Sequence, residues 1–206
     1  MKIERLILGL LHTNCYIVYN EKTLECAVID PADNFDAIKS KLDELNLKTE
    51  FIILTHAHWD HFGALDELKK YTGAKLIMGK NEANSLSNAC LNLTGHFRKK
   101  APESHADIIV DDNEEMKIAG NTFRFIFTPG HTKGSISIYT GNFVFSGDTL
   151  FYESIGRTDF ESGNINDIMD SIKNKLFSLP NDTVVFSGHG EQTTIGHEKD
   201  NNPYVW

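Results

Sequence analysis

The first third of the sequence consists of short apolar runs separated by turn residues. Three of these runs predict the strands of a meander: Leu6–Leu8, Cys15–Tyr19 and Cys26–Ile29. Apolar residues from Phe35 to Leu45 then recur at helical spacing and predict a helix over 34–46. The run Phe51–Leu54 is apolar throughout and predicts a buried strand.

The same reading of periodicity covers the rest of the chain. It predicts helices over 61–71 and 166–177, a weaker helix over 81–92, and an irregular polar loop over 93–106. The remaining segments predict strands: 75–78, Ile108–Val110, Met116–Ala119, Thr122–Phe127, Ser135–Tyr139, Asn142–Phe145 and Thr183–Phe186. Strands precede helices in each half, and no linker separates the halves. This order favours a layered α/β sandwich over a strictly alternating parallel sheet.

Composition narrows the class of protein. A length of 206 residues fits a single domain over 1–206. The net charge of −9 argues against nonspecific binding to nucleic acid or to an anionic membrane. We see no signal peptide and no apolar stretch of the ~18 residues that a membrane span needs. The 3 cysteines are widely spaced, which is typical of reduced thiols in a cytoplasmic protein.

Candidate metal ligands follow four of the predicted strands. Each strand ends in a small or turn residue, and the next side chain can bind a metal: His56, His131, Asp148 and His189. The last two segments are near copies that both read Phe-Ser-Gly before the ligand. Glycine permits sharp turns and close packing, so we expect these strand ends to form one crowded cleft.

The densest signal is Thr55-His-Ala-His-Trp-Asp-His61, which holds His56, His58, Asp60 and His61. Residues two apart in an extended segment point the same way, so His56 and His58 can bind one ion. Asp60 and His61 lie where the next helix is expected to begin and can bind a second ion. Imidazole and carboxylate ligands suit zinc, iron or manganese, and the absence of a nearby cysteine favours an open catalytic site.

These motifs resemble the metallo-β-lactamase superfamily. The resemblance covers nearly the whole chain through 55–61, Pro-Gly-His-Thr-Lys-Gly-Ser at 129–135, Ser-Gly-Asp-Thr-Leu-Phe at 146–151 and Ser-Gly-His-Gly at 187–190. Gly-Arg-Thr-Asp at 156–159 and the segment 193–204 are similar to short glyoxalase II (hydroxyacylglutathione hydrolase) enzymes. The chain departs from the family pattern at Lys133 and Glu191, which replace common prolines outside the ligand positions.

The resemblance implies a four-layer αββα sandwich and a site for two divalent ions. In such a site His56, His58 and His131 hold one ion, Asp60, His61 and His189 hold the other, and Asp148 bridges them. Zinc is the expected metal, with iron or manganese as alternatives. An aspartate at 148 favours thioesterase, phosphodiesterase or lactonase members, because true β-lactamases of the superfamily usually carry cysteine or serine there.

The expected reaction is hydrolysis of S-2-hydroxyacylglutathione or a related small-molecule thioester. A thiolate leaves without a strong general acid, because thiols have a pKa of about 8.5. Asp60 is the candidate catalytic residue, since its carboxylate can orient the attacking water. Arg157 is the candidate substrate-binding residue, with an ordinary exposed ion pair as the alternative. We expect no helical C-terminal domain of the kind found in long glyoxalase II enzymes, so loops 80–106 and 150–164, or a second subunit of a homodimer, would complete the pocket.

Three other functions compete with this one. The first is a persulfide dioxygenase-like oxidoreductase with a single iron, since such enzymes share Gly-Arg-Thr-Asp and the ligand set. The second is a lactonase or other hydrolase of the same fold, and the third is a nonenzymatic binding module. We expect His12, His96, His105 and His197 to lie outside the metal site, and Trp59 and Phe62 to pack the helix or line the pocket.

Overall fold

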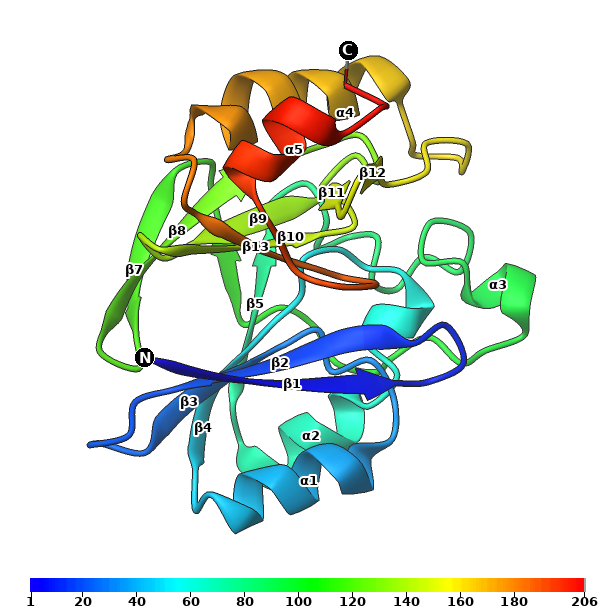
Figure 1. The fold of residues 1–206 in the computed structure, drawn as a ribbon. Helices are drawn as coiled ribbons and strands as arrows, with labels where there is room; N and C mark the ends of the chain where they lie inside the picture. The colour runs from blue at the N-terminus through cyan, green and yellow to red at the C-terminus, as the bar shows by residue number, and fades with distance from the viewer. Residues whose placement is uncertain (206) are drawn as a thin grey trace.

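Two six-stranded sheets face each other across the middle of the molecule, and helices cover their outer faces (Figure 1). The computed structural model describes residues 1–205. The layers run helix, sheet, sheet, helix, so the expected four-layer sandwich is confirmed. No helix within residues 1–205 is long and apolar enough to cross a membrane.

The first sheet has its strands in sequence order, antiparallel from β1 to β3 and parallel from β3 to β6. Its strands are β1 (Lys2–Leu8), β2 (Thr13–Tyr19), β3 (Glu25–Ile29), β4 (Lys48–Ile53), β5 (Lys75–Gly79) and β6 (Ile108–Val110). The predicted meander and the strands at 51–54, 75–78 and 108–110 are therefore confirmed within a few residues.

The second sheet has the order β14-β13-β10-β9-β8-β7. Its strands are β7 (Glu114–Ile118), β8 (Asn121–Phe127), β9 (Ile136–Tyr139), β10 (Phe143–Gly147), β13 (Val184–Ser187) and β14 (Thr193–Thr194). Strands β10 and β13, the near copies, pair in parallel, so their ligand-bearing ends lie together. A short hairpin of β11 (Leu150–Phe151) and β12 (Ser154–Ile155) follows β10.

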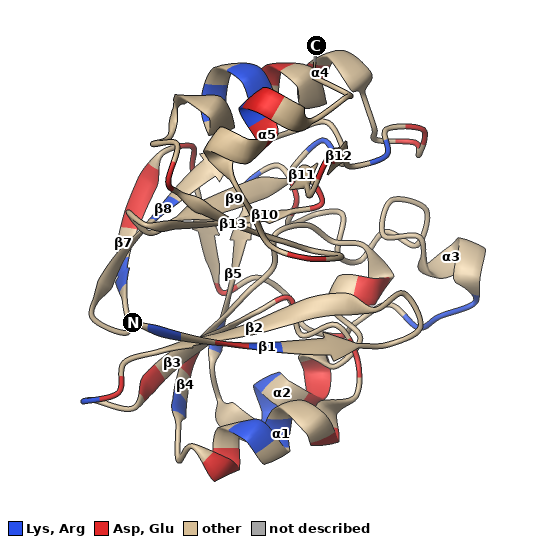
Figure 2. Cartoon of the chain, in the orientation of Figure 1, with Lys and Arg blue, Asp and Glu red and all other residues tan. Residues whose placement is uncertain are grey.

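The helices are α1 (Phe35–Glu44), α2 (Leu65–Thr72), α3 (Thr94–Phe97), α4 (Ile165–Asp170) and α5 (Ile195–Asn201). Helix α4 continues through a π-helical turn at Ser171–Lys175 and a 3₁₀ turn at Leu176–Ser178, which together match the predicted helix over 166–177. Charged residues of both signs lie along α1, α2, α5 and the helical run formed by α4 and its π-helical turn (Figure 2), as expected for helices with one face in water.

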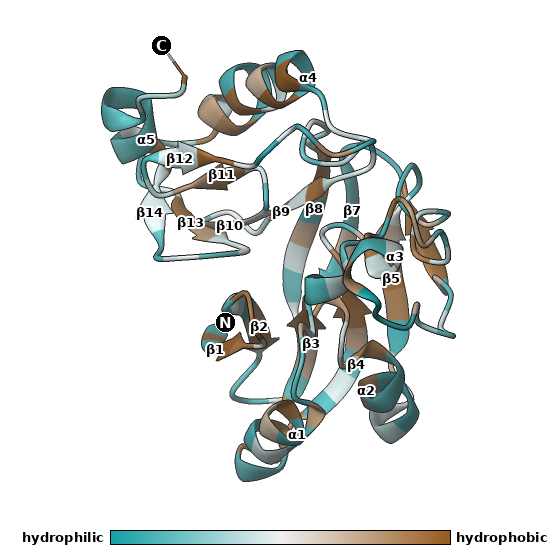
Figure 3. Cartoon of the chain, turned by 90° about the vertical axis from the view of Figure 1, so that its right-hand side faces the viewer, coloured by the Kyte–Doolittle hydropathy of each residue, from teal (hydrophilic) through white to brown (hydrophobic). Residues whose placement is uncertain are grey.

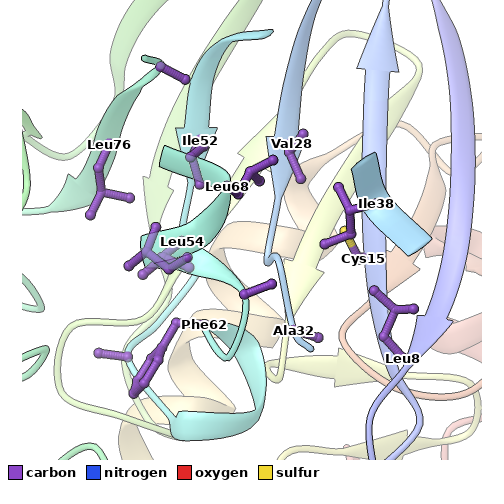
Figure 4. Packing of buried hydrophobic residues seen from close by; sticks show 14 of the residues in the cluster. Leu8, Cys15, Val28, Ala32, Ile38, Ile52, Leu54, Phe62, Leu68 and Leu76 are labelled. Atoms are coloured by element: carbon purple, nitrogen blue, oxygen red, sulfur yellow. The ribbon is translucent and has the colours of Figure 1, made fainter. Parts of the chain in front are cut away.

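Three apolar cores hold the four layers together. Strand β4 and the residue after it show why: Ile52 and Leu54 pack toward α1 and α2, whereas Ile53 packs toward the second sheet. Successive side chains of a strand point to opposite faces, so an all-apolar run serves two cores at once. Figure 4 shows the core under α1 and α2. In Figure 3 the strands of the two sheets are largely apolar, and the helices outside them are more polar.

Three predicted elements differ in the structure. The helix predicted over 81–92 is wrong: this segment forms successive turns, in which the Asn88 side chain accepts from Cys90 N and Leu91 N. Such side chains compete with helical hydrogen bonds. The loop predicted over 93–106 contains α3, and α2 begins at Leu65, after a 3₁₀ turn at Trp59–His61, rather than at 61. Helix α5 was not predicted from the sequence.

Candidate metal centre

The candidate ligands gather where strands of both sheets end. His56 follows β4 of the first sheet, whereas His131, Asp148 and His189 follow β8, β10 and β13 of the second. The two sheets are joined at this edge by a bridge between Thr13 and His189 and by a hydrogen bond from Asn14 N to Gly188 O of 2.7 Å. Strand ends from two sheets thus bring together residues that are far apart in sequence.

The ligand atoms form three groups, within each of which they lie no more than 4.8 Å apart. The groups are His56, His58 and His131; Asp60, His61 and His189; and His56, His61 and Asp148. Asp148 lies between the first two, because its Oδ2 is 3.5 Å from His131 Nε2 and 3.4 Å from His189 Nε2. The structure therefore brings the side chains of all seven candidate ligands together, with Asp148 next to both groups of three.

Buried polar atoms in this cluster lack hydrogen-bond partners. His56 Nε2, His58 Nε2, His61 Nε2 and Asp148 Oδ1 are buried and unpaired. Such an atom costs about 1–3 kcal/mol when nothing satisfies it. Nitrogen and carboxylate oxygen atoms at this spacing are the donors that zinc, iron or manganese ions accept, so the residues fit divalent metal ions.

Other hydrogen bonds fix the imidazole rings. His131 Nδ1 donates to the carbonyl oxygen of Arg157 at 2.8 Å, and His189 Nδ1 donates to Leu11 O at 3.1 Å. His61 Nδ1 pairs with Asp30 Oδ2 at 3.0 Å. A histidine that donates its second nitrogen in this way presents the other nitrogen in a fixed direction, as metal-binding histidines do.

Two buried carboxylates that the sequence analysis did not single out support the cluster. Asp30, at the end of β3, also accepts from Thr55 N at 2.8 Å and from Thr55 Oγ1 at 2.7 Å. Glu82 accepts from Ala57 N at 2.9 Å and from Thr132 Oγ1 at 3.0 Å, and so ties the His56–His58 loop to the loop after His131. The sequence could have pointed to Asp30, because Asp30 directly follows a predicted strand, as the candidate ligands do. Glu82 gave no such signal, because it lies in the segment wrongly predicted as helical.

The three histidines of the first group remain uncharged. Burial, together with the neighbouring histidine charges, lowers the pKa of His58 to about 3 and that of His56 well below its usual value. Burial also lowers the pKa of His131. Neutral imidazoles keep the lone pairs that a metal ion needs.

The second group carries charge. Burial alone would lower the pKa of His189, but hydrogen bonds to Asp148 and Asp60 raise it to about 9. The pKa of His61 is likewise raised well above its usual value by Asp148 and Asp60, against the effect of its burial. Burial opposes ionisation of Asp60 and Asp148, yet His61 and His189 lower the pKa of both carboxyls. The two carboxylates thus attract positive charge to the place where the ring nitrogens converge.

Two glycines make the crowding possible. A Cβ on Gly188 would lie 2.1 Å from Asp148 Oδ1, and one on Gly156 would lie 1.7 Å from the Asp148 carbonyl oxygen. Neither approach is sterically possible, so no residue with a side chain fits at these points without moving the aspartate. The expected role of the Phe-Ser-Gly copies in permitting a crowded site is confirmed at Gly188.

A cleft with a volume of about 410 Å³ opens beside the cluster. It is lined by Asp60, Asp148 and three of the histidines together with Trp59, Leu93, Phe97, Phe151 and Phe160. The segments 93–97 and 151–160 thus contribute to it, within the loops expected to form the pocket. Helix α3 and the β11–β12 hairpin lie on the same side of the molecule (Figure 1).

Arg157 lies at this cleft, but its guanidinium group is already paired. Nε and Nη2 donate to the two carboxylate oxygens of Asp159 at 2.7 Å each, and the group stacks on Phe160 at 4.0 Å. The exposed ion pair considered from the sequence is therefore present. Its backbone carbonyl, rather than its side chain, contacts the candidate metal ligand His131.

The remaining residues considered earlier lie outside the ligand groups. Among residues 1–205, His12, His96, His105 and His197 belong to none of the three groups, as predicted. His197 instead contacts Glu153 at 3.0 Å. Phe62 packs in the core under α1 and α2, whereas Trp59 both joins that core and lines the cleft.

The family model described as "Metallo-beta-lactamase superfamily" matches residues 8–189. The probable metallo-hydrolase YqgX of Bacillus subtilis is 37% identical over 100% of this chain and 98% of its own length. The hydroxyacylglutathione hydrolase GloC of Haemophilus influenzae is 33% identical over 100% of this chain and 98% of its own length.

Solved structures agree with the sequence matches. The BLEG-1 B3 metallo-β-lactamase is similar with a TM-score of 0.94 and 36% identity, covering 99% of both chains. ETHE1 from Myxococcus xanthus has a TM-score of 0.85 and 32% identity over 100% of this chain and 84% of that one. TTHA1623 in a di-iron-bound form has a TM-score of 0.86 and 30% identity over 98% of this chain and 99% of that one. The chain therefore belongs to the metallo-β-lactamase superfamily, and it carries a histidine and aspartate cluster suited to divalent metal ions.

Proposed function

We propose that this protein is a binuclear metallohydrolase that cleaves thioesters, with S-2-hydroxyacylglutathione as the first substrate to test. The observation that carries the proposal is the position of Asp148 between two groups of three ligands. The similarity to a protein named hydroxyacylglutathione hydrolase supports the choice of substrate.

The makeup of the cleft favours a thioester over an amide. Apart from the proposed ligands, the described residues lining the cleft offer protons only on Trp59, Ser154 and Arg157. None of these side chains titrates near neutral pH. An amine leaving group would need a proton donor, whereas a thiolate, whose conjugate acid has a pKa of about 8.5, departs without one.

Each of the seven proposed ligands has a role in holding metal, and Asp60 has a second role in catalysis. His56, His58 and His131 would hold one ion, Asp60, His61 and His189 the other, and Asp148 both. When bound, such ions lower the pKa of a coordinated water to about 7 and polarise a carbonyl oxygen. Asp60 accepts a hydrogen bond from Thr13 Oγ1 at 3.1 Å and stays ionised, so its carboxylate can accept a hydrogen bond from the attacking water and orient it.

Zinc is the proposed metal, with iron or manganese as alternatives. Nitrogen and carboxylate ligands suit all three ions. The structural neighbour in a di-iron-bound form makes iron the first alternative to test.

The decisive experiment combines metal analysis with two assays on the same preparation. We expect two metal ions per chain and hydrolysis of S-lactoylglutathione that is lost on chelation and restored by the metal. One iron per chain, with oxygen uptake on glutathione persulfide and no thioester turnover, would instead identify the oxidoreductase alternative.

A β-lactam is the second candidate substrate. It is favoured by the 36% identity to a protein named a B3 metallo-β-lactamase. An aspartate at 148 argues against it, given the cysteine or serine usual in β-lactamases of this family. Turnover of a chromogenic cephalosporin exceeding that of S-lactoylglutathione would make the β-lactam the better description of the substrate.

A further inference from the structure

The walls of the cleft beside the metal centre are mostly apolar. Leu11, Leu93, Phe97, Phe151, Ile155 and Phe160 line it. Phe160 meets the His58 ring edge-on at 5.7 Å, and Phe151 lies 6.2 Å from the His189 ring, so apolar surface begins next to the candidate ligands. A group attached to the reacting carbonyl or its sulfur would therefore enter apolar surroundings.

Some of these side chains are also unusually exposed. Leu11 is 49% exposed and Phe97 is 48% exposed, while Leu10, next to Leu11 in the β1–β2 turn, is 77% exposed. Exposed apolar side chains that line a cleft mark a binding surface more often than a structural one, because exposing them to water is unfavourable. Leu11 and Phe97 line the cleft, so a ligand in the cleft would cover them.

Charge recognition is weak at the same walls. Among the described lining residues outside the ligand cluster, Arg157 carries the one basic side chain. Asp159 binds two of its nitrogens, so a substrate carboxylate would have to compete with a bidentate partner already in place. The pair as a whole offers an approaching anion little net charge.

We propose that the cleft recognises an apolar arm of the substrate, and that Asp159 prevents Arg157 from selecting for an anionic thiol. This inference rests on the proposed function, because it places the apolar arm on a thioester. It predicts that thioesters with large alkyl or aromatic groups are better substrates than those whose affinity depends on the carboxylates of glutathione.

The test measures equilibrium binding of thioethers, which resemble the substrate but cannot be hydrolysed. Metal-loaded protein would be titrated with S-methyl- and S-hexyl-N-acetylcysteamine and with S-hexylglutathione, using calorimetry and Trp59 fluorescence. We expect the hexyl compound to bind at least ~10-fold more tightly than the methyl compound, since each buried methylene contributes. We expect S-hexylglutathione to bind within ~3-fold of its neutral counterpart.

Variants separate the two parts of the proposal. Phe160→Ala should remove most of the preference for hexyl over methyl, whereas Ile109→Ala, a change at an exposed residue on β6, should not. Asp159→Asn should strengthen binding of S-hexylglutathione by several-fold and leave the neutral thioether unchanged. Asp182→Asn, which removes an exposed carboxylate elsewhere, should change neither.

Two outcomes would overturn the inference. One is equal affinity for the methyl and hexyl compounds, and the other is binding of S-hexylglutathione more than ~10-fold tighter than its neutral counterpart. Because these measurements need no turnover, they are separate from the thioesterase assay. Preference for the hexyl compound without hydrolysis of any thioester would contradict the proposed function and leave the apolar site in place.

Discussion

The two ligand groups of the metal centre differ in charge and in exposure. His56, His58 and His131 are buried and neutral, and burial lowers the pKa of all three. The other group contains an aspartate and two histidines of raised pKa, and the His189 side chain is 26% exposed. The first group presents neutral ring nitrogens with free lone pairs, whereas in the second group two histidines hold protons that a bound metal ion would displace.

This difference bears on how the cluster could hold the two metal ions that we propose. If both groups carried the same charge, they would repel each other. Two like unit charges 4 Å apart repel by about 4 kcal/mol at an effective dielectric constant of 20. Here the negative charge is concentrated on Asp60 and on the shared Asp148, close to the second group. We therefore expect the two groups to respond differently to substitution.

The largest effect is expected from Asp148→Asn, because Asp148 serves both groups. The neutral amide keeps the size of the side chain and removes its charge. Both metal equivalents should fall, and kcat/KM should drop by more than the ~100-fold that loss of an outer partner typically costs. Elemental analysis and the thioester assay measure this, and Asp182→Asn is the control. Full metal content in the Asp148 variant would contradict the bridging role.

A smaller loss is expected when one group alone is damaged. His58→Ala should remove the ion of the neutral group, and His189→Ala that of the charged group, each leaving about one metal per chain. Competition with a graded series of chelators should show that the ions remaining in the two variants differ in affinity. If both variants retain two ions, these histidines are not ligands.

The supporting carboxylates should extend the comparison to the surroundings of each group. Asp30→Asn should weaken metal binding mainly at the charged group, because Asp30 orients His61. Glu82→Gln should act on the neutral group through Ala57 and Thr132. We expect losses of ~10–100-fold in metal affinity. Thermal unfolding measured alongside separates this from general destabilisation, and equal effects on both ions would show that the two supports are not specific.

The smallest effect is expected at Arg157. Substitution by alanine retains the backbone carbonyl that orients His131, so metal content should not change. Because the guanidinium group is already paired with Asp159 in an exposed position, KM for S-lactoylglutathione should rise by less than ~3-fold. A tenfold rise would show that Arg157 leaves Asp159 to bind the substrate.

Sequence alone singled out the side chains that gather in the cluster, because the pattern that marks them is local. Four candidate ligands lie within 56–61, and three more each follow an apolar strand through a small or turn residue. The sequence did not predict the turns over 81–92, since the apolar spacing there resembles a helix while asparagine side chains bind the backbone instead. Glu82 lies in the same segment and was also missed, because its hydrogen-bond partners, Ala57 and Thr132, lie far away in the chain.

The sequence by itself determined most of the strands and the identity of the candidate ligands, because alternation, apolar runs and donor type depend on neighbouring residues. Only the tertiary structure decided which ligands share a group, which histidines stay neutral, and that Arg157 is held by Asp159 beside an apolar cleft. Those properties depend on distance, burial and the field of charges from other strands, which no local pattern of residues specifies.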